Sequence, residues 1–252
     1  MPPWTWISAA ATTAATAWFL ANYNLWRIPR PRAWPRLLMY HRCDDIPGDG
    51  MNTRPEVFEQ QLAWLAPRCR FLTVSQLLQQ TTELGERPPV CLTFDDGFRD
   101  NYERAFPLLQ RFRASATIYL APQISGIDSL RATEIRGMVD SGLIEFGAHT
   151  VHHVNLTQVD EATARREIVD SKNAVEQLTG RPCHSFAYPF GRWNDRVAEL
   201  VREAGFLSAV TTRKTIKPLS KIDPFRIPRL SMNGRMTPWQ FRIAFSRGRY
   251  RV

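Results

Sequence analysis

Two short runs of this sequence contain residue types that could bind a metal ion and activate a water molecule. Residues 93–97, with the sequence TFDDG, place two carboxylates side by side, and residues 149–153, HTVHH, hold three histidines within five positions. Imidazole nitrogens suit Zn²⁺ or a related first-row ion. His149 and His153 are four residues apart and would share one face of a helical turn. One carboxylate would complete a two-histidine, one-carboxylate site with positions left open for water and substrate.

The adjacent aspartates, Asp95 and Asp96, are expected to have different chemical roles. Two neighbouring carboxylates repel each other unless something stabilises the second charge. One aspartate would bind the cation, and the other would accept a proton from a metal-bound water, whose pKa falls toward ~7. Two other interpretations stay open, namely a surface histidine cluster and an aspartate that caps a helix through residues 98–100.

The elements that must position these residues follow from the apolar pattern. Strands are expected at 37–40, 90–94, 116–120, 143–148, 185–188 and 207–210. Helices are expected at 55–65, 101–112, from an N-cap at Thr157 to Gly180, and at 195–204. Such alternation predicts an α/β fold with a parallel sheet, of which a barrel is one form. His41, Asp95, His149 and Pro189 each follow a strand, so we expect them to meet at one edge.

These motifs make the sequence resemble the polysaccharide deacetylase family, the NodB homology group of carbohydrate esterases. The family motif T-F-D-D-G matches residues 93–97, H-[ST]-x-x-H matches residues 149–153, and similarity extends from about Leu37 to Met232. The resemblance implies a deformed (β/α) barrel of about seven strands and a divalent metal ion, with zinc expected. It also implies hydrolysis of an N-acyl group by attack of a metal-activated water on the amide carbonyl.

Carried over by motif, the resemblance makes Asp95 the general base. Asp96, His149 and His153 become the metal ligands, and His152 a bystander or a residue behind the ligands.

The sequence departs from the family pattern in two places. The third motif, R-x-P-[YF]-G, is only partly matched by residues 187–191, because Ala187 stands where the arginine would be. We expect Arg229, or else Arg192, to supply that charge to the base. No histidine follows His184, so the late general-acid histidine of many members is missing.

A different histidine is therefore expected to protonate the leaving amine. Met39-Tyr40-His41 resembles an element of the branch that includes poly-N-acetylglucosamine deacetylases, where this histidine acts as the acid. The alternative is a structural histidine at a strand end.

Aromatic residues around the third motif are candidates for substrate binding. They could present ring faces to sugar rings, or they could pack the edge of the sheet. The candidate set comprises Tyr188, Pro189, Phe190, Gly191 and Trp193.

The ends of the chain differ in composition from its middle. The first 26 residues carry no charged side chain, and arginines follow them within a net charge of +9. We expect a membrane anchor at 1–26, a Pro/Arg linker at 27–35, the catalytic domain at 36–234 and a basic aromatic tail at 235–252. A signal peptide and a buried helix are the alternatives for the first segment. No nucleic-acid-binding motif accompanies the charge, so nucleic acid is not expected as a partner.

The four cysteines form no C-x-x-C pair, which disfavours a zinc ribbon, and they do not resemble a disulfide framework, which favours a reducing compartment. Cys91 lies in an apolar strand-like run and is expected to be buried. Arginines on the carboxyl side of the anchor favour an inner-membrane protein with its catalytic domain in the cytoplasm.

The leading hypothesis is N-deacetylation of a lipid-linked amino sugar for cell-envelope polysaccharide or lipopolysaccharide synthesis. An extracytoplasmic deacetylase of exopolysaccharide or peptidoglycan, and an inactive carbohydrate-binding or scaffold protein, are the alternatives.

Overall fold

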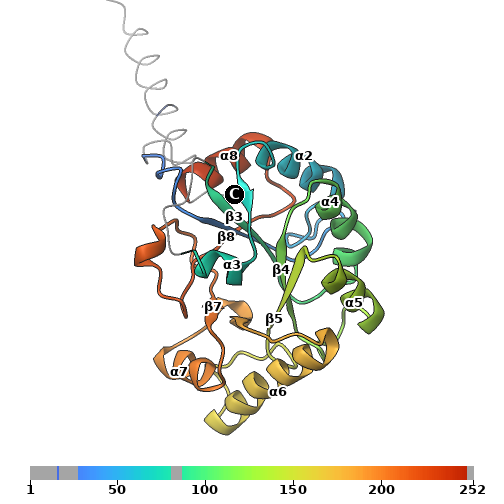
Figure 1. Cartoon of the computed structure of the whole chain (residues 1–252), viewed down its shortest axis with the longest axis vertical. Helices are drawn as coiled ribbons and strands as arrows, with labels where there is room; N and C mark the ends of the chain where they lie inside the picture. The colour runs from blue at the N-terminus through green and yellow to red at the C-terminus, as the bar shows by residue number, and fades with distance from the viewer. Residues whose placement is uncertain (1–15, 17–27, 81–86, 249–252) are drawn as a thin grey trace, which may run out of the picture.

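Parallel strands that alternate with helices form the body of the molecule (Figure 1), which the computed structural model describes for residues 16, 28–80 and 87–248. The strands are β1 (Arg36–Tyr40), β2 (Arg70–Phe71), β3 (Pro89–Phe94), β4 (Ala116–Leu120), β5 (Ile144–Ala148), β6 (Ser185–Ala187), β7 (Ser208–Val210) and β8 (Leu230–Ser231). The α-helices are α2 (Pro55–Leu65), α3 (Val74–Leu78), α4 (Phe106–Arg111), α5 (Ala132–Asp140), α6 (Glu161–Thr179), α7 (Asp195–Glu203) and α8 (Pro238–Arg247).

The strands pair in the order β7-β6-β5-β4-β3-β1-β8, and every ladder is parallel. The segment that follows β7 brings the two edges together, because Ile227 bridges to Val210 while β8 pairs with β1. The predicted deformed barrel is therefore confirmed. The sequence did not indicate β2 and β8, since strands of two residues are too short to show a period.

Side chains alternate between the outside and the inside of this barrel, as the two-residue period of a strand requires. Outward residues such as Leu38 and Phe94 pack against the surrounding helices in the main apolar core. Inward residues such as Cys91, Tyr119 and Ala187 form a smaller interior cluster. The carboxyl ends of the strands make one end of the barrel, called here the rim, and α3 covers the other end, called the floor.

Two helical boundaries differ from the expectation. The helix expected to be capped by Thr157 begins at Glu161, because the Asp160 carboxylate accepts a 2.9 Å hydrogen bond from the Thr163 amide, whereas Thr157 bonds to Asn155 in a preceding turn. The helix expected over 101–112 starts with a π-helical turn at Asn101–Ala105 and becomes α-helical only from Phe106.

The expected membrane anchor at 1–26 lies outside the described residues, apart from residue 16. Among the described residues, no helix is both long enough and apolar enough to cross a membrane. The described part of the expected linker is folded back, since the buried Arg36 guanidinium donates hydrogen bonds to the carbonyls of Arg30, Pro31 and Phe245.

The expected tail also packs on the domain where it is described. It forms α8, in which Phe241, Ile243 and Phe245 are buried. All four cysteines are free and buried, and the burial of Cys91 was expected.

Candidate active site

Asp96, His149 and His153 form a cluster at the rim that could hold a metal ion. One side-chain atom from each lies within 4.8 Å of the others. The Nε2 atoms of His149 and His153 are 3.6 and 3.5 Å from Oδ1 of Asp96. Asp96 follows the carboxyl end of β3 and the histidines follow the carboxyl end of β5, with β4 between the two strands, so the parallel sheet places the two sequence motifs at the same end.

Both histidines are prepared to act as ligands through neutral imidazole nitrogens. Nδ1 of His149 lies 2.7 Å from the Ala187 carbonyl, which can only accept, so Nδ1 carries the proton and Nε2 keeps its lone pair toward Asp96. Burial lowers the pKa of His149 to about 3, and burial also lowers the pKa of His153. At neutral pH both rings are therefore uncharged, as metal ligation requires.

The carboxylate of Asp96 fits the same interpretation. Its Oδ1 atom is buried and has no hydrogen-bond partner in the described part of the chain, although buried polar atoms normally have one. Burial, followed by the charge of Asp95, raises the pKa of Asp96 to about 6. A bound cation would satisfy the orphaned oxygen and favour the ionised carboxylate. Two imidazoles and a carboxylate around one point thus fit a divalent ion.

The backbone at the rim is held in conformations that side chains rarely adopt. Asp96, Thr150, His153 and Phe190 all have positive φ, with values of 73°, 62°, 57° and 57°. The expected helical turn at 149–153 is therefore wrong, because left-handed residues at 150 and 153 interrupt it and form an irregular turn. Such strain clusters at functional sites, where the surrounding structure imposes it.

Glu167 of α6 holds this turn in place. Its Oε2 accepts hydrogen bonds from the amides of Val151 and His152 at 2.8 and 3.1 Å, and its Oε1 lies 2.6 Å from Nδ1 of His152. His152 also contacts Gln123, so its ring is committed to these partners. The sequence signal that could have found Glu167 is a carboxylate on the buried face of an amphipathic helix.

Arg229 lies against Asp95 in a buried two-pronged ion pair. Its Nη1 and Nη2 donate to Oδ1 and Oδ2 of Asp95 at 2.6 and 2.7 Å, and Nη1 also contacts Thr93 at 3.1 Å. Burial would raise the pKa of Asp95, but the Arg229 guanidinium outweighs burial and holds this pKa well below its usual range. Arg192, the other candidate partner, is exposed on the surface.

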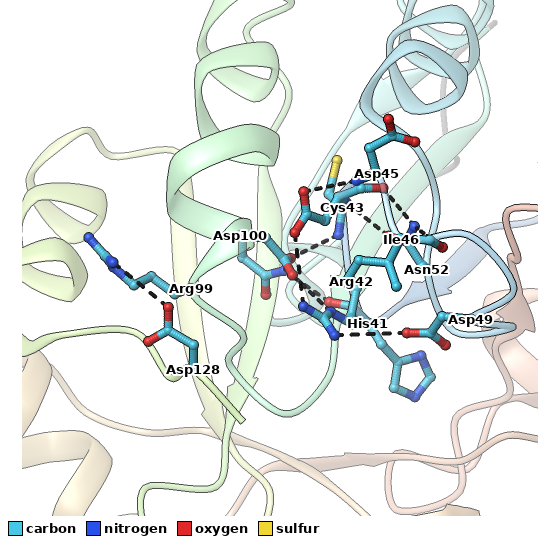
Figure 2. A network of polar contacts seen from close by, with 12 residues as sticks. His41, Arg42, Cys43, Asp45, Ile46, Asp49, Asn52, Arg99, Asp100 and Asp128 are labelled. Carbon is cyan, nitrogen blue, oxygen red and sulfur yellow. Dashed lines mark hydrogen bonds and ion pairs between the residues drawn. The ribbon is translucent and has the colours of Figure 1, made fainter. Parts of the chain in front are cut away.

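His41 lies directly after β1 and is half-buried. A network behind it fixes its main chain: the Asn101 amide donates to the His41 carbonyl at 2.9 Å, and the Asp100 carboxylate accepts from the Cys43 amide at 2.8 Å and from Arg42 at 3.0 Å. Figure 2 shows the His41 ring pointing away from this network. His41 is also close enough to Asp95 and Asp96 to lower the pKa of each, as a smaller contribution than burial.

The candidate substrate-binding residues separate into two groups. Tyr188 is fully buried, and its hydroxyl donates to the Phe225 carbonyl at 3.0 Å, so the expectation that its ring faces a sugar is wrong. Pro189 is also buried. By contrast, Phe190 is 60% exposed, with its ring centroid 4.5 Å from that of His153.

Gly191 and Trp193 continue this loop. A Cβ atom on Gly191 would lie 2.0 Å from Oγ1 of Thr212, so only glycine fits there. Trp193 is half-buried and lies under the Arg226 guanidinium, 4.5 Å from the ring centroid. Phe190 is thus the aromatic side chain that the loop presents openly beside the histidines.

Comparisons with known proteins agree with this geometry. A family model described as polysaccharide deacetylase matches residues 83–209. YxkH of Bacillus subtilis, which carries polysaccharide deacetylase in its name, is 29% identical over 70% of this chain. The poly-beta-1,6-N-acetyl-D-glucosamine N-deacetylase of Staphylococcus aureus is 27% identical over 69% of it. The matched regions span 63% and 65% of those relatives, less than two thirds of their length.

Solved structures show the same fold. A polysaccharide deacetylase from Bacillus cereus is 27% identical and superposes with a TM-score of 0.75, covering 84% of this chain and 69% of that one. The Streptococcus pyogenes deacetylase PplD, solved with acetate, has a TM-score of 0.76 at 24% identity, covering 85% and 97% of the two chains. The second likeness supports the fold alone.

Proposed function

The chain belongs to the polysaccharide deacetylase family, and from that premise we propose that it hydrolyses the N-acetyl group of an amino sugar in a glycan. Water would add across the amide C–N bond, which releases acetate and leaves a free amine on the sugar. One observation carries the proposal: Oδ1 of Asp96 is buried without a hydrogen-bond partner, within 3.6 Å of two imidazole nitrogens. The arginine-held Asp95 is its neighbour in the chain.

Asp96, His149 and His153 would hold the divalent ion, and zinc is proposed because two imidazoles and a carboxylate form one of its common ligand sets. Such an ion supplies Lewis acidity toward the amide oxygen and lowers the pKa of a nearby water.

Asp95 and His41 are proposed as the two proton-transfer groups. Asp95 is ionised throughout the physiological pH range because Arg229 lowers its pKa, so its carboxylate is available to accept a proton from the attacking water. The two guanidinium contacts fix its orientation. His41 would donate a proton to the departing nitrogen, with its main chain held by Asn101.

The substrate class is proposed from the relatives and from the rim. The Staphylococcus aureus relative is named for poly-beta-1,6-N-acetyl-D-glucosamine, and the exposed ring of Phe190 offers an apolar face for a sugar. We therefore favour a polymeric N-acetylated amino sugar. The cytoplasmic inner-membrane location and the lipid-linked substrate stay predictions, which a reporter fused to the carboxyl terminus and glycan mass spectrometry would test.

The activity is tested with the full chain and N-acetylglucosamine oligomers of β-1,6 and β-1,4 linkage. Acetate and free amine should appear in equal amounts. Both should stop after treatment with a chelator and return when zinc is added. Protein that retains bound zinc but releases no acetate from either series would contradict the proposal and favour an inactive binding protein.

A further inference from the structure

A cavity of about 650 Å³ lies at the floor end of the molecule, away from the candidate active site. Its walls come from the residues that enter β1, the carboxyl end of α2, the residues that enter β3, and α8. α2 and α8 lie side by side (Figure 1), with the Trp64 and Phe241 ring centroids 5.8 Å apart. We call it the arginine cavity.

The walls of the arginine cavity are strongly basic. No carboxylate is among the described side chains that line it. Exposed arginines surround it, and none of these takes part in an ion pair among the described residues: Arg30, Arg32, Arg68, Arg87 and Arg242. On α6 and α7, by contrast, Arg165 and Arg196 are paired with Glu161 and Glu203. The cavity therefore concentrates positive charge that the described part of the protein leaves uncompensated.

Tryptophan and apolar side chains accompany this charge. Trp239 is 53% exposed and Ile28 is 82% exposed. The guanidinium groups of Arg68 and Arg242 lie 5.2 and 6.0 Å from the Trp64 ring centroid. Arginine together with exposed tryptophan is the combination that favours the head-group region of a bilayer, where one end of each side chain is wet and the other apolar.

We propose that the protein binds, through the arginine cavity and the side chains around it, to a membrane surface that contains anionic phospholipids. The charge complements the phosphate groups, and Trp239 and Ile28 can enter the head-group layer beside them. Residues 1–26, which carry no charged side chain, precede Arg27 and Ile28 in the chain, and the next residue, Pro29, lines the cavity. A soluble anion would match the arginines but would leave the exposed apolar side chains without a partner.

This docking sets the orientation of the active site relative to the membrane. The cavity lies where β1 and β3 begin, and the five residues of β1 separate it from the rim by ~17 Å at the usual rise per residue. If the proposed function holds, the rim takes a glycan that extends away from the membrane rather than a sugar held at the head groups.

The test measures binding of the full chain to vesicles of phosphatidylcholine, with and without phosphatidylglycerol. Each arginine near an anionic surface contributes about fivefold to binding. The triple variant Arg30→Gln, Arg68→Gln, Arg242→Gln should therefore lose about a hundredfold of the binding that phosphatidylglycerol adds. Taking the ratio between the two vesicle types removes any binding that does not depend on charge.

The matched control changes the same net charge elsewhere. Arg104, Arg136 and Arg166 are exposed and in no ion pair among the described residues. The triple variant Arg104→Gln, Arg136→Gln, Arg166→Gln should keep the full effect of phosphatidylglycerol. Equal loss in both variants, or a wild type indifferent to phosphatidylglycerol, would overturn the proposal.

Two further measurements identify the occupant. Brominated lipids should quench the fluorescence of the wild type more than that of Trp239→Phe. Glycerol phosphate should compete no better than salt of the same ionic strength, and specific competition would show a free-anion site instead. Acetate release from soluble oligomers should be unchanged in the cavity variant. If the wild type releases none, the proposed function fails while the vesicle result stands.

Discussion

At the floor of the barrel the carboxylate of Glu145 accepts hydrogen bonds on both oxygens, whereas at the rim the carboxylate of Asp96 has a buried oxygen that receives none. Oε2 of Glu145 accepts from the Ser75 amide at 3.1 Å and from the Thr117 hydroxyl at 3.0 Å, and Oε1 accepts from the Ser75 hydroxyl. Oδ1 of Asp96 instead lies 3.6 and 3.5 Å from two imidazole nitrogens, and that of His149 has no proton to donate because Nδ1 of the ring carries it.

The backbone shows the same contrast. Among the described residues, four of the five non-glycine residues with positive φ belong to the rim, and the fifth is Arg113. At the floor, polar side chains form hydrogen bonds that join α3 to the barrel. At the rim, the buried oxygen of Asp96 and the neighbouring imidazole nitrogens are available to bind a ligand, and the backbone there is strained. Stability and function are thus separated along the barrel axis, so substitutions at the two ends should have different effects.

The largest effect is expected for Asp95→Asn at the rim. The amide keeps an oxygen for Arg229 but cannot accept the proton, so the deacetylation rate should fall by about 10²- to 10⁴-fold. Metal content should persist, because Asp96, His149 and His153 are untouched. Steady-state acetate release and bound zinc would be measured together. A variant with nearly full activity would remove Asp95 from the role of base.

The next effect concerns Asp96→Asn in the metal-free protein. Burial and Asp95 raise the pKa of Asp96 from 3.8 to about 6. A carboxyl whose pKa is raised by folding contributes stability below its unfolded pKa and loses it as the pH rises through 6. Above pH 7 the variant should therefore have a free energy of unfolding roughly 3 kcal/mol higher than that of the wild type, and below about pH 3 the difference should vanish.

Denaturant unfolding at several pH values checks this prediction. The comparison between variant and wild type cancels the opposite contribution of His149, whose lowered pKa costs stability in acid. Saturating zinc should reverse the order of stability, because only the wild type has all three ligands. If the variant is less stable than the metal-free wild type at pH 8, the ionised carboxylate of Asp96 must be stabilised by an interaction other than metal binding.

At the floor, Glu145→Gln should lower the free energy of unfolding, whereas Asp96→Asn at the rim raises it in the metal-free protein. It replaces a charged acceptor whose donors on Ser75 and Thr117 are already in place, so stability should fall by about 1–3 kcal/mol. Catalysis per folded molecule should change by less than about twofold. Urea unfolding and acetate release report the two quantities separately, and a loss of rate without a loss of stability would break the division between floor and rim.

The smallest effect is expected for Phe190→Ala. An aromatic face beside the site is worth about 0.5–1.5 kcal/mol, so the KM for oligomers should rise by about two- to tenfold with little change in kcat. Leu207→Ala is the matched control, because Leu207 is similarly exposed, at 61% against 60%, and lies at the start of β7 on the floor side. An equal change in KM for both variants would remove Phe190 from the substrate surface.

Local spacing was enough to predict most strands and both halves of the metal cluster. The runs 93–97 and 149–153 carry their ligands directly after apolar strands, and parallel strands place such residues at the same end. The predicted helical turn at 149–153 is wrong because Thr150 and His153 are left-handed, and Glu167 of α6 binds the amides of Val151 and His152 between them, a contact that a local pattern does not contain.

The sequence by itself determined which residues can bind a metal and that they follow strands, because both properties depend on neighbours in the chain. Only the tertiary structure decided that Arg229 and not Arg192 meets Asp95, across 134 positions, and that Tyr188 turns into the core while Phe190 turns out. It also decided that Glu145 is satisfied by Ser75 from 70 positions away. Such choices depend on which distant surfaces the barrel brings into contact, and burial and charge pairing then fix the partner.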